Sequence, residues 1–130
     1  MTEGIVNGLF QALEGWNLLL IIFGTLLGII FGSMPGLTAT MGLALLVPFT
    51  FGMEPAAGLI MLAGIYVGAM YADAIPAILI NTPGTPAAIA TTFDGFPLAQ
   101  KGKAQEALVT AAFASFIGSI VANIVLATLA

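Results

Sequence analysis

Long stretches of the sequence carry no charged residue. No charge occurs between Glu14 and Glu54. Three further uncharged windows follow, at residues 55–72, 74–93 and 107–130. A membrane-spanning helix needs about 20 consecutive apolar residues, so every window is at or near spanning length. The pattern predicts an all-α, polytopic integral membrane protein with its membrane segments in residues 18–130.

The N-terminal residues follow an amphipathic pattern instead. Residues 3–14 alternate at helical spacing between a polar and an apolar face. The polar face holds Glu3, Asn7, Gln11 and Glu14, and the apolar face holds Ile5, Leu9 and Leu13. This pattern predicts an interfacial helix within residues 1–15. Trp16 suits the headgroup level, and Asn17 is the expected N-cap of a first span from about Leu18 to Ser33.

Two proline-glycine steps interrupt the apolar sequence, at residues 34–39 and 81–87. Proline removes a backbone donor and glycine relaxes the chain, so a helix cannot run smoothly through either step. Within a bilayer, such breaks survive only where they are buried in protein or line a cavity. We therefore expect Pro-Gly-broken or re-entrant half-helices. They are a short helix from Thr38 to about Leu46, which runs into Val47-Pro48-Phe49, and a short helical piece from Pro86 to Thr92.

The remaining segments complete the predicted layout. Glu54-Pro55 opens a helix that continues to about Tyr71, and residues 74–80 lead to the second break. Asp94-Gly95-Phe96-Pro97 is typical of a turn, which predicts a polar loop over residues 94–106 before a last span from Ala107. Both lysines of the chain, Lys101 and Lys103, lie in this loop, so the positive-inside rule places it in the cytoplasm.

Glycines recur at every fourth position in two apolar segments, as Gly24, Gly28 and Gly32 and as Gly64 and Gly68. Stripes of small residues let two helix backbones approach closely. We expect these stripes to serve helix packing.

Composition supports a membrane protein and excludes several other classes. Hydrophobic residues make up 60% of the chain and charged residues 6%, and the mean hydropathy is +1.14, whereas soluble domains are about a quarter charged. The chain has no cysteine or histidine, which removes thiolate nucleophiles, imidazole bases and the usual zinc ligands. A net charge of −4 leaves no basic surface for nucleic acid, and no residue pattern supports catalysis. Residues 1–15 lack the basic start of a signal peptide, and the chain stops inside an apolar run, so we expect an N-terminal fragment of a longer protein.

Polar side chains gather at both breaks. They are Ser33, Thr38 and Thr40 beside Pro35 and Gly36, and Asn81, Thr82 and Thr85 beside Pro83 and Gly84. A helix that begins after such a step directs unpaired N–H groups and about half a positive charge forward, which favours an anion. These ten residues are the predicted substrate-binding set, as in transporters that bind anions at half-helix N-termini. Local capping of the interrupted helices is the alternative for each of them.

Asp73 is the one charge deep within apolar sequence. An intramembrane carboxylate is expensive and is by default a functional hypothesis. Asp73 could bind a cation, take up a proton, or lie at a helix end near the membrane surface. We expect cation or proton coupling, since no basic residue of this chain is placed to pair with it.

Several motifs occur together in one order and resemble a known transporter family. They are Gly28-x-x-x-Gly32-x-x-Pro35-Gly36-Leu37, Leu45-Leu46-Val47-Pro48-Phe49-Thr50-Phe51, Gly64-Ile65-Tyr66-x-Gly68-Ala69-Met70-Tyr71, Ile78-Leu79-Ile80-Asn81-Thr82-Pro83-Gly84 and Asp94-Gly95-Phe96-Pro97-Leu98-Ala99-x-Lys101-Gly102. From about Leu18 onward, the chain resembles the large membrane subunit of tripartite tricarboxylate transporters, the TctA family. The resemblance implies a bacterial inner-membrane protein that takes up carboxylates such as citrate, coupled to Na⁺ or H⁺. It also implies a small membrane subunit and a periplasmic solute-binding protein as partners, with no cofactor.

One departure from the family pattern concerns Asp73. Where the family usually reads Tyr-Gly-Gly-Ser, this chain has Tyr71-Ala72-Asp73-Ala74. A negative charge there would repel a carboxylate substrate unless a proton or a cation neutralises it. The expected function is a membrane subunit that couples carboxylate uptake to a cation. A non-transporting scaffold or assembly subunit, whose breaks serve only packing, is the alternative.

Overall fold

The computed structural model describes residues 2–129, and this part of the chain is helical without strands. The helices are α1 (Thr2–Ala12), α2 (Gly15–Ser33), α3 (Ala39–Thr50), α4 (Pro55–Ala72), α5 (Ala74–Ile80), the 3₁₀ turn η1 (Pro86–Ala88), α6 (Ile89–Gln100) and α7 (Ala104–Leu129). Three segments are long and apolar enough to cross a membrane: α2, the joined α4–α5 segment and α7. The predicted all-α membrane fold is confirmed.

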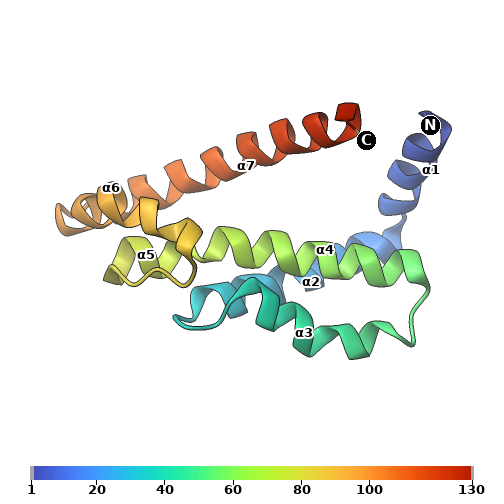
Figure 1. Cartoon of the computed structure of the whole chain (residues 1–130), viewed down its shortest axis with the longest axis horizontal. Helices are drawn as coiled ribbons and strands as arrows, with labels where there is room; N and C mark the ends of the chain where they lie inside the picture. Colours follow the sequence, from blue (N-terminus) through green and yellow to red (C-terminus); the bar gives the residue numbers. More distant parts are fainter. Residues whose placement is uncertain (1, 130) are drawn as a thin grey trace.

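The α2 and α4 helices form the most tightly packed pair. They lie side by side over most of their lengths (Figure 1). A Cβ at Gly24, Gly28 or Gly32 would overlap backbone atoms of α4, and one at Gly64 or Gly68 would overlap backbone atoms of α2. Both glycine stripes therefore face each other, as small residues at a helix interface allow. The predicted packing role of the stripes is confirmed.

A small apolar cluster lies along this interface. Its buried members are Leu20, Ala57, Met61 and Ile65, with side chains of α3 packed against it. α3 lies against α4, whereas α6 packs on α5 at the opposite end from α1 (Figure 1). α7 contacts α5 and α6 near its start, and no residue of its most apolar window is buried in the described chain.

The N-terminal helix is present, but its junction with the first span differs from the prediction. α1 covers most of residues 3–14, while its interfacial placement stays a prediction. Asn17 is not an N-cap, because α2 begins at Gly15. Its side chain is buried, and its Nδ2 donates to the Gln11 carbonyl oxygen over 2.7 Å. Asn17 thus ties α2 to the end of α1.

The structure corrects two predicted helix ends. α3 continues through Val47-Pro48-Phe49 to Thr50. Residues 94–106 do not form a polar loop, because α6 runs to Gln100 and α7 begins at Ala104. Both prolines, Pro48 and Pro97, lie in the last turn of their helices, where a missing N–H costs a single backbone bond.

Tertiary packing explains why the Asp94-Gly95 sequence is helical. Gly95 is buried, and a Cβ there would come within 2.7 Å of the Ile78 side chain. The absent side chain lets α6 approach α5 closely, and this contact outweighs a local turn preference. For the same reason, the helical segment after the second break extends well beyond Thr92.

Candidate functional site

The first break is a tight turn with local hydrogen bonds. The Leu37 amide donates to the Met34 carbonyl oxygen over 3.1 Å, and Gly36 has φ +90°. Proline followed by a glycine with positive φ is the signature of a type II turn. The chain therefore reverses at Pro35-Gly36 rather than bending gradually between α2 and α3.

The hydroxyl groups predicted at this break are engaged with nearby atoms. Thr38 is the N-cap of α3, because its Oγ1 accepts from the Met41 amide over 3.3 Å. The hydroxyls of Thr38 and Thr40 lie 2.7 Å apart, and the Ser33 hydroxyl donates to the Ile30 carbonyl oxygen over 3.0 Å. These contacts fit the capping alternative. Substrate binding by Ser33, Pro35, Gly36, Thr38 and Thr40 stays a prediction.

The second break begins with a helix termination. Asn81 has left-handed backbone geometry with φ 55°, and the Thr82 amide donates to the Pro76 carbonyl oxygen over 3.2 Å. A left-handed residue followed by an amide that bonds back to the last turn ends α5 at Ile80. The Thr82 hydroxyl donates locally to the Ile80 carbonyl oxygen over 3.2 Å. Asn81 and Thr82 therefore shape the end of α5.

Asp73 lies at the junction of α4 and α5, where Pro76 cannot donate a backbone bond back toward Ala72. Asp73 is only 5% exposed. The Thr85 hydroxyl donates to Asp73 Oδ2, which links the second break to this junction. Asp73 Oδ1 is buried and has no hydrogen-bond partner among the described residues. Buried polar atoms are normally paired, so this oxygen is an exception that calls for an explanation.

Both breaks come close to this carboxylate. A Cβ at Gly84 would overlap Asp73 Oδ1 and would lie 3.8 Å from the Leu37 carbonyl oxygen. Gly84 therefore makes room for the carboxylate, with the end of the first break just beyond it. Of the predicted set, Thr85 and Gly84 contact Asp73, whereas the first-break hydroxyls bond within their own segment.

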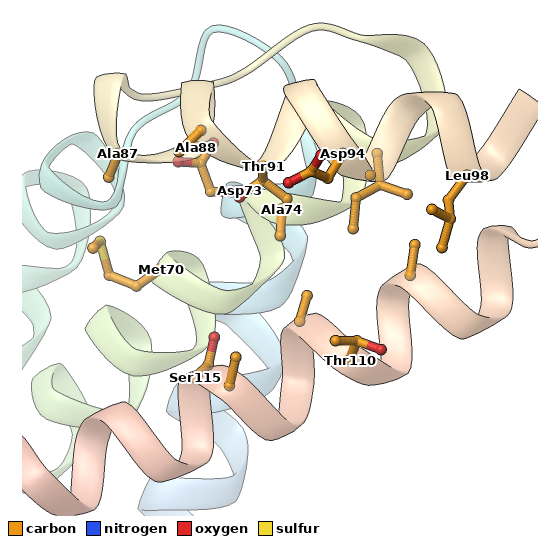
Figure 2. Close-up of a pocket in the computed structure, with 16 residues that line it drawn as sticks. Met70, Asp73, Ala74, Ala87, Ala88, Thr91, Asp94, Leu98, Thr110 and Ser115 are labelled. Carbon is orange, nitrogen blue, oxygen red and sulfur yellow. The ribbon is translucent and has the colours of Figure 1, made fainter.

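A pocket of about 570 Å³ opens beside Asp73, between α5, α6 and α7. Its lining is mostly alanine and other apolar residues, together with Asp73, Thr91, Asp94, Thr110 and Ser115. Figure 2 shows the Asp94 carboxylate extending from α6 on the same side of the pocket as Asp73. The pocket therefore carries two carboxylates, and its lining includes no lysine or arginine.

The sequence reasoning missed the contribution of Asp94, because Asp94-Gly95 suggested a turn. A helical interpretation would have placed Thr91 and Asp94 three residues apart on one face. The exposed Asp94 contrasts with the buried Asp73.

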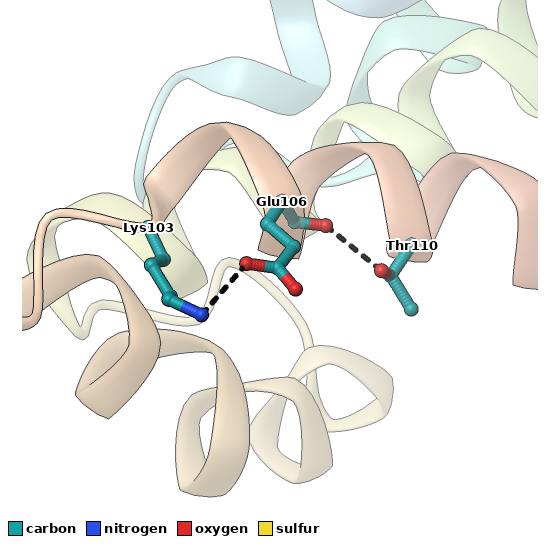
Figure 3. Close-up of polar contacts among 3 residues, drawn as sticks. All are labelled: Lys103, Glu106 and Thr110. Carbon is teal, nitrogen blue, oxygen red and sulfur yellow. Dashed lines mark hydrogen bonds and ion pairs between the residues drawn. The ribbon is translucent and has the colours of Figure 1, made fainter.

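Both lysines of the chain are exposed, and Lys103 pairs with Glu106. Lys103 Nζ lies 3.3 Å from a Glu106 carboxylate oxygen (Figure 3). Both side chains are more than 60% exposed. Among residues 2–129, this is the one ion pair, so Asp73 has no cationic side chain as a partner there. Glu106 provides a carboxylate outside the pocket for comparison with Asp73 and Asp94.

Sequence comparison identifies the protein family of this chain. The sequence profile described as "Tripartite tricarboxylate transporter TctA family" matches residues 18–130. The chain belongs to the TctA family. This TctA chain is also 44% identical over 120 residues to an Agrobacterium vitis protein described as an uncharacterized 52.8 kDa protein in the TAR-I ttuC' 3' region. The match covers 92% of the chain and 24% of that relative, so the chain spans about a quarter of its length. No solved structure matches it.

Proposed function

We propose that this chain is part of the membrane subunit of a cation-coupled transporter that imports organic carboxylates. Tricarboxylates such as citrate, or related dicarboxylates, are the substrates. A small membrane subunit and a periplasmic solute-binding protein are the partners, and the bacterial inner membrane is the location. Membership of the TctA family supports this proposal, together with three segments long enough to span a membrane.

The buried Asp73 carboxylate carries the coupling part of the proposal. It lies where the two breaks approach each other, with one oxygen unpaired. Two like charges about 5 Å apart repel by roughly 3 kcal/mol at an effective dielectric constant of about 20. A carboxylate substrate near Asp73 therefore binds well only when a cation or a proton neutralises that charge. This requirement couples the movement of the two species.

Uptake by membrane vesicles that contain the full-length protein and both partners tests the proposal. We expect uptake of radiolabelled citrate or a dicarboxylate that depends on the binding protein and on an inward cation gradient. Asp73→Asn removes the charge with little change in shape, and it should abolish gradient-driven uptake. Glu106→Gln removes one exposed carboxylate outside the pocket and should transport as the wild type does.

A scaffold without transport activity is the second candidate. The local hydrogen bonds of Ser33, Thr38 and Thr82 favour it, because these groups serve helix ends. No carboxylate uptake by the complete complex, together with loss of complex assembly when the α2–α4 glycines are changed, would support the scaffold and contradict the transporter.

Membrane orientation can be tested independently of transport. We propose that the short α6–α7 connection, with Lys101 and Lys103, faces the cytoplasm. A Lys101→Cys variant in a cysteine-free background should react with a membrane-impermeant maleimide only in inside-out vesicles. Labelling from the periplasmic side would contradict this orientation.

A further inference from the structure

We propose that the groove between α4 and α7 receives one transmembrane helix from the part of the full-length protein that lies outside residues 1–130. The incoming helix packs against the small residues of α7 and pairs with the Asn123 side chain. This inference concerns how the membrane domain is assembled. It therefore goes beyond the proposed function and holds for a transporter and for a scaffold alike.

The first observation is the groove itself, which has a volume of about 670 Å³. Residues of α2 and α4, among them Tyr66 and Tyr71, line it together with residues of α7. α7 contacts α5 and α6 near its start and then diverges from α4 toward its C-terminal end (Figure 1). No residue of its most apolar window is buried within residues 2–129. The described helices therefore leave the groove open along α7.

The second observation is the pattern of residues on α7. Ser115, Ser119 and Asn123 follow one another at four-residue intervals, and all three line the groove. Gly118 and Ala122 lie beside them at the same spacing and line the groove too. Residues four apart lie on one face of a helix. The face of α7 that borders the groove therefore consists largely of small and polar side chains.

The opposite face of α7 carries large apolar side chains instead. Phe113, Ile117, Ile120 and Ile124 are all exposed, and none of them lines the groove. Within a bilayer, small residues occur at helix interfaces, and polar side chains face the interior of a helix bundle. Large apolar side chains suit the lipid. α7 therefore directs its small and polar face toward protein and its large apolar face toward lipid.

Asn123 supplies the chemistry of recognition. The residue is exposed in the described chain, and its amide has two N–H donors and one acceptor oxygen. Ser119 differs, because its hydroxyl donates to the Ser115 carbonyl oxygen within α7. An amide without a partner is unfavourable in hydrocarbon. A hydrogen-bonding side chain of the incoming helix, such as serine, threonine, asparagine or glutamine, should therefore lie opposite Asn123.

The length of the protein favours a helix of the same polypeptide as the occupant. The match covers 24% of the Agrobacterium vitis relative, so most of a family member of that length lies outside the matched region. A helix on the same polypeptide docks at a high effective concentration, because it is tethered to α7 by the chain. A second copy of the protein and the small membrane subunit are the competing occupants, and the experiment distinguishes them.

Photo-cross-linking in native membranes identifies the occupant. In the full-length protein, expressed with its partner subunits, a diazirine derivative of phenylalanine replaces either Phe116 or Phe113. Phe116 lines the groove, whereas Phe113 is exposed outside it, so the two positions form a matched pair with little change in shape. We expect position 116 to cross-link to a peptide from outside residues 1–130, in a product with the mass of one chain. Position 113 should label mainly lipid. Products of position 116 that contain only lipid, α4, the small membrane subunit or a second copy would overturn the proposal.

The sign of two stability changes tests the same packing by thermal unfolding of the full-length protein. A Cβ at Gly118 has no heavy atom within 4 Å among the described residues, so Gly118→Leu would stabilise an unpartnered helix through its higher helix propensity. In the occupied groove, the leucine blocks close approach. We therefore expect Gly118→Leu to lower Tm, and Ile124→Leu on the opposite face to leave it unchanged.

Asn123→Leu removes the proposed hydrogen bond between helices. It should lower the equilibrium constant for folding by roughly 3- to 20-fold, whereas a leucine at a lipid-facing position would raise it. Unfolding at or above the wild-type temperature in either Gly118→Leu or Asn123→Leu would contradict helix docking on this face.

Discussion

Gly84→Ala should impair the proposed cation coupling although the substitution adds only a methyl group. The Cβ would overlap Asp73 Oδ1, and the carboxylate is buried with little room to move. Rotating it away breaks the hydrogen bond from Thr85. A hydrogen bond to a charged group contributes about 1.5–3 kcal/mol, which corresponds to roughly a 10- to 150-fold change in an equilibrium constant. We therefore expect the concentration of the coupling cation for half-maximal uptake to rise by about tenfold or more.

The assay is the initial rate of labelled carboxylate uptake by vesicles over a range of Na⁺ or H⁺ concentrations. Gly52→Ala is the matched control, because a Cβ there has no heavy atom within 4 Å. Denaturant unfolding in detergent separates the mechanism from general damage. If Gly84→Ala acts by displacing Asp73, the cation dependence of uptake should change in a protein that still folds. Unchanged cation dependence in Gly84→Ala would refute the reasoning.

Three further variants test the packing, the first break and the carboxylate contact. Gly28→Ala should lower the free energy of unfolding by about 1–3 kcal/mol, because its Cβ would overlap the α4 backbone. Gly8→Ala should leave this free energy unchanged, because a Cβ there has no heavy atom within 4 Å. Denaturant unfolding in detergent measures both. Gly36→Ala should cost about 1–2 kcal/mol of unfolding free energy in the same assay, because φ is +90° there. Thr85→Val should raise the cation concentration for half-maximal uptake by roughly tenfold or more, and the same rate measurement on Thr92→Val should match the wild type.

Much of the helical framework could be predicted from the sequence because hydrophobic length determines it. The uncharged windows contain α2, the α4–α5 segment apart from Asp73, and most of α7. The four-residue glycine period indicated which helix faces pack together, since only glycine permits backbones this close. The start of α4 could also be predicted, because a proline such as Pro55 is tolerated in the first turn of a helix.

Two of the errors arose because contacts between helices override local preferences. Asp94-Gly95 has turn chemistry, yet Gly95 is helical because its missing side chain accommodates Ile78. Asparagine is a common N-cap residue, yet Asn17 lies within α2 and its side-chain amide donates to the Gln11 carbonyl oxygen. Neither partner can be identified without the fold.

The candidate site was only partly accessible to sequence reasoning. The isolated charge of Asp73 in apolar sequence pointed to it directly. Its contact with Thr85 spans the second break, and the placement of Asp94 beside the same pocket depends on how α6 folds back onto α5. Both depend on the three-dimensional path of the chain.

The cation dependence of carboxylate uptake in Asp73→Asn tests the central claim most directly. Vesicles with the complete transporter are given labelled carboxylate over a range of external Na⁺ and, separately, of external pH, with wild type and Glu106→Gln measured alongside. We predict that one of the two cations, Na⁺ or H⁺, stimulates uptake by the wild type and by Glu106→Gln, and that neither has an effect in Asp73→Asn. The same cation dependence in Asp73→Asn as in the wild type would contradict the claim that this carboxylate couples cation and substrate.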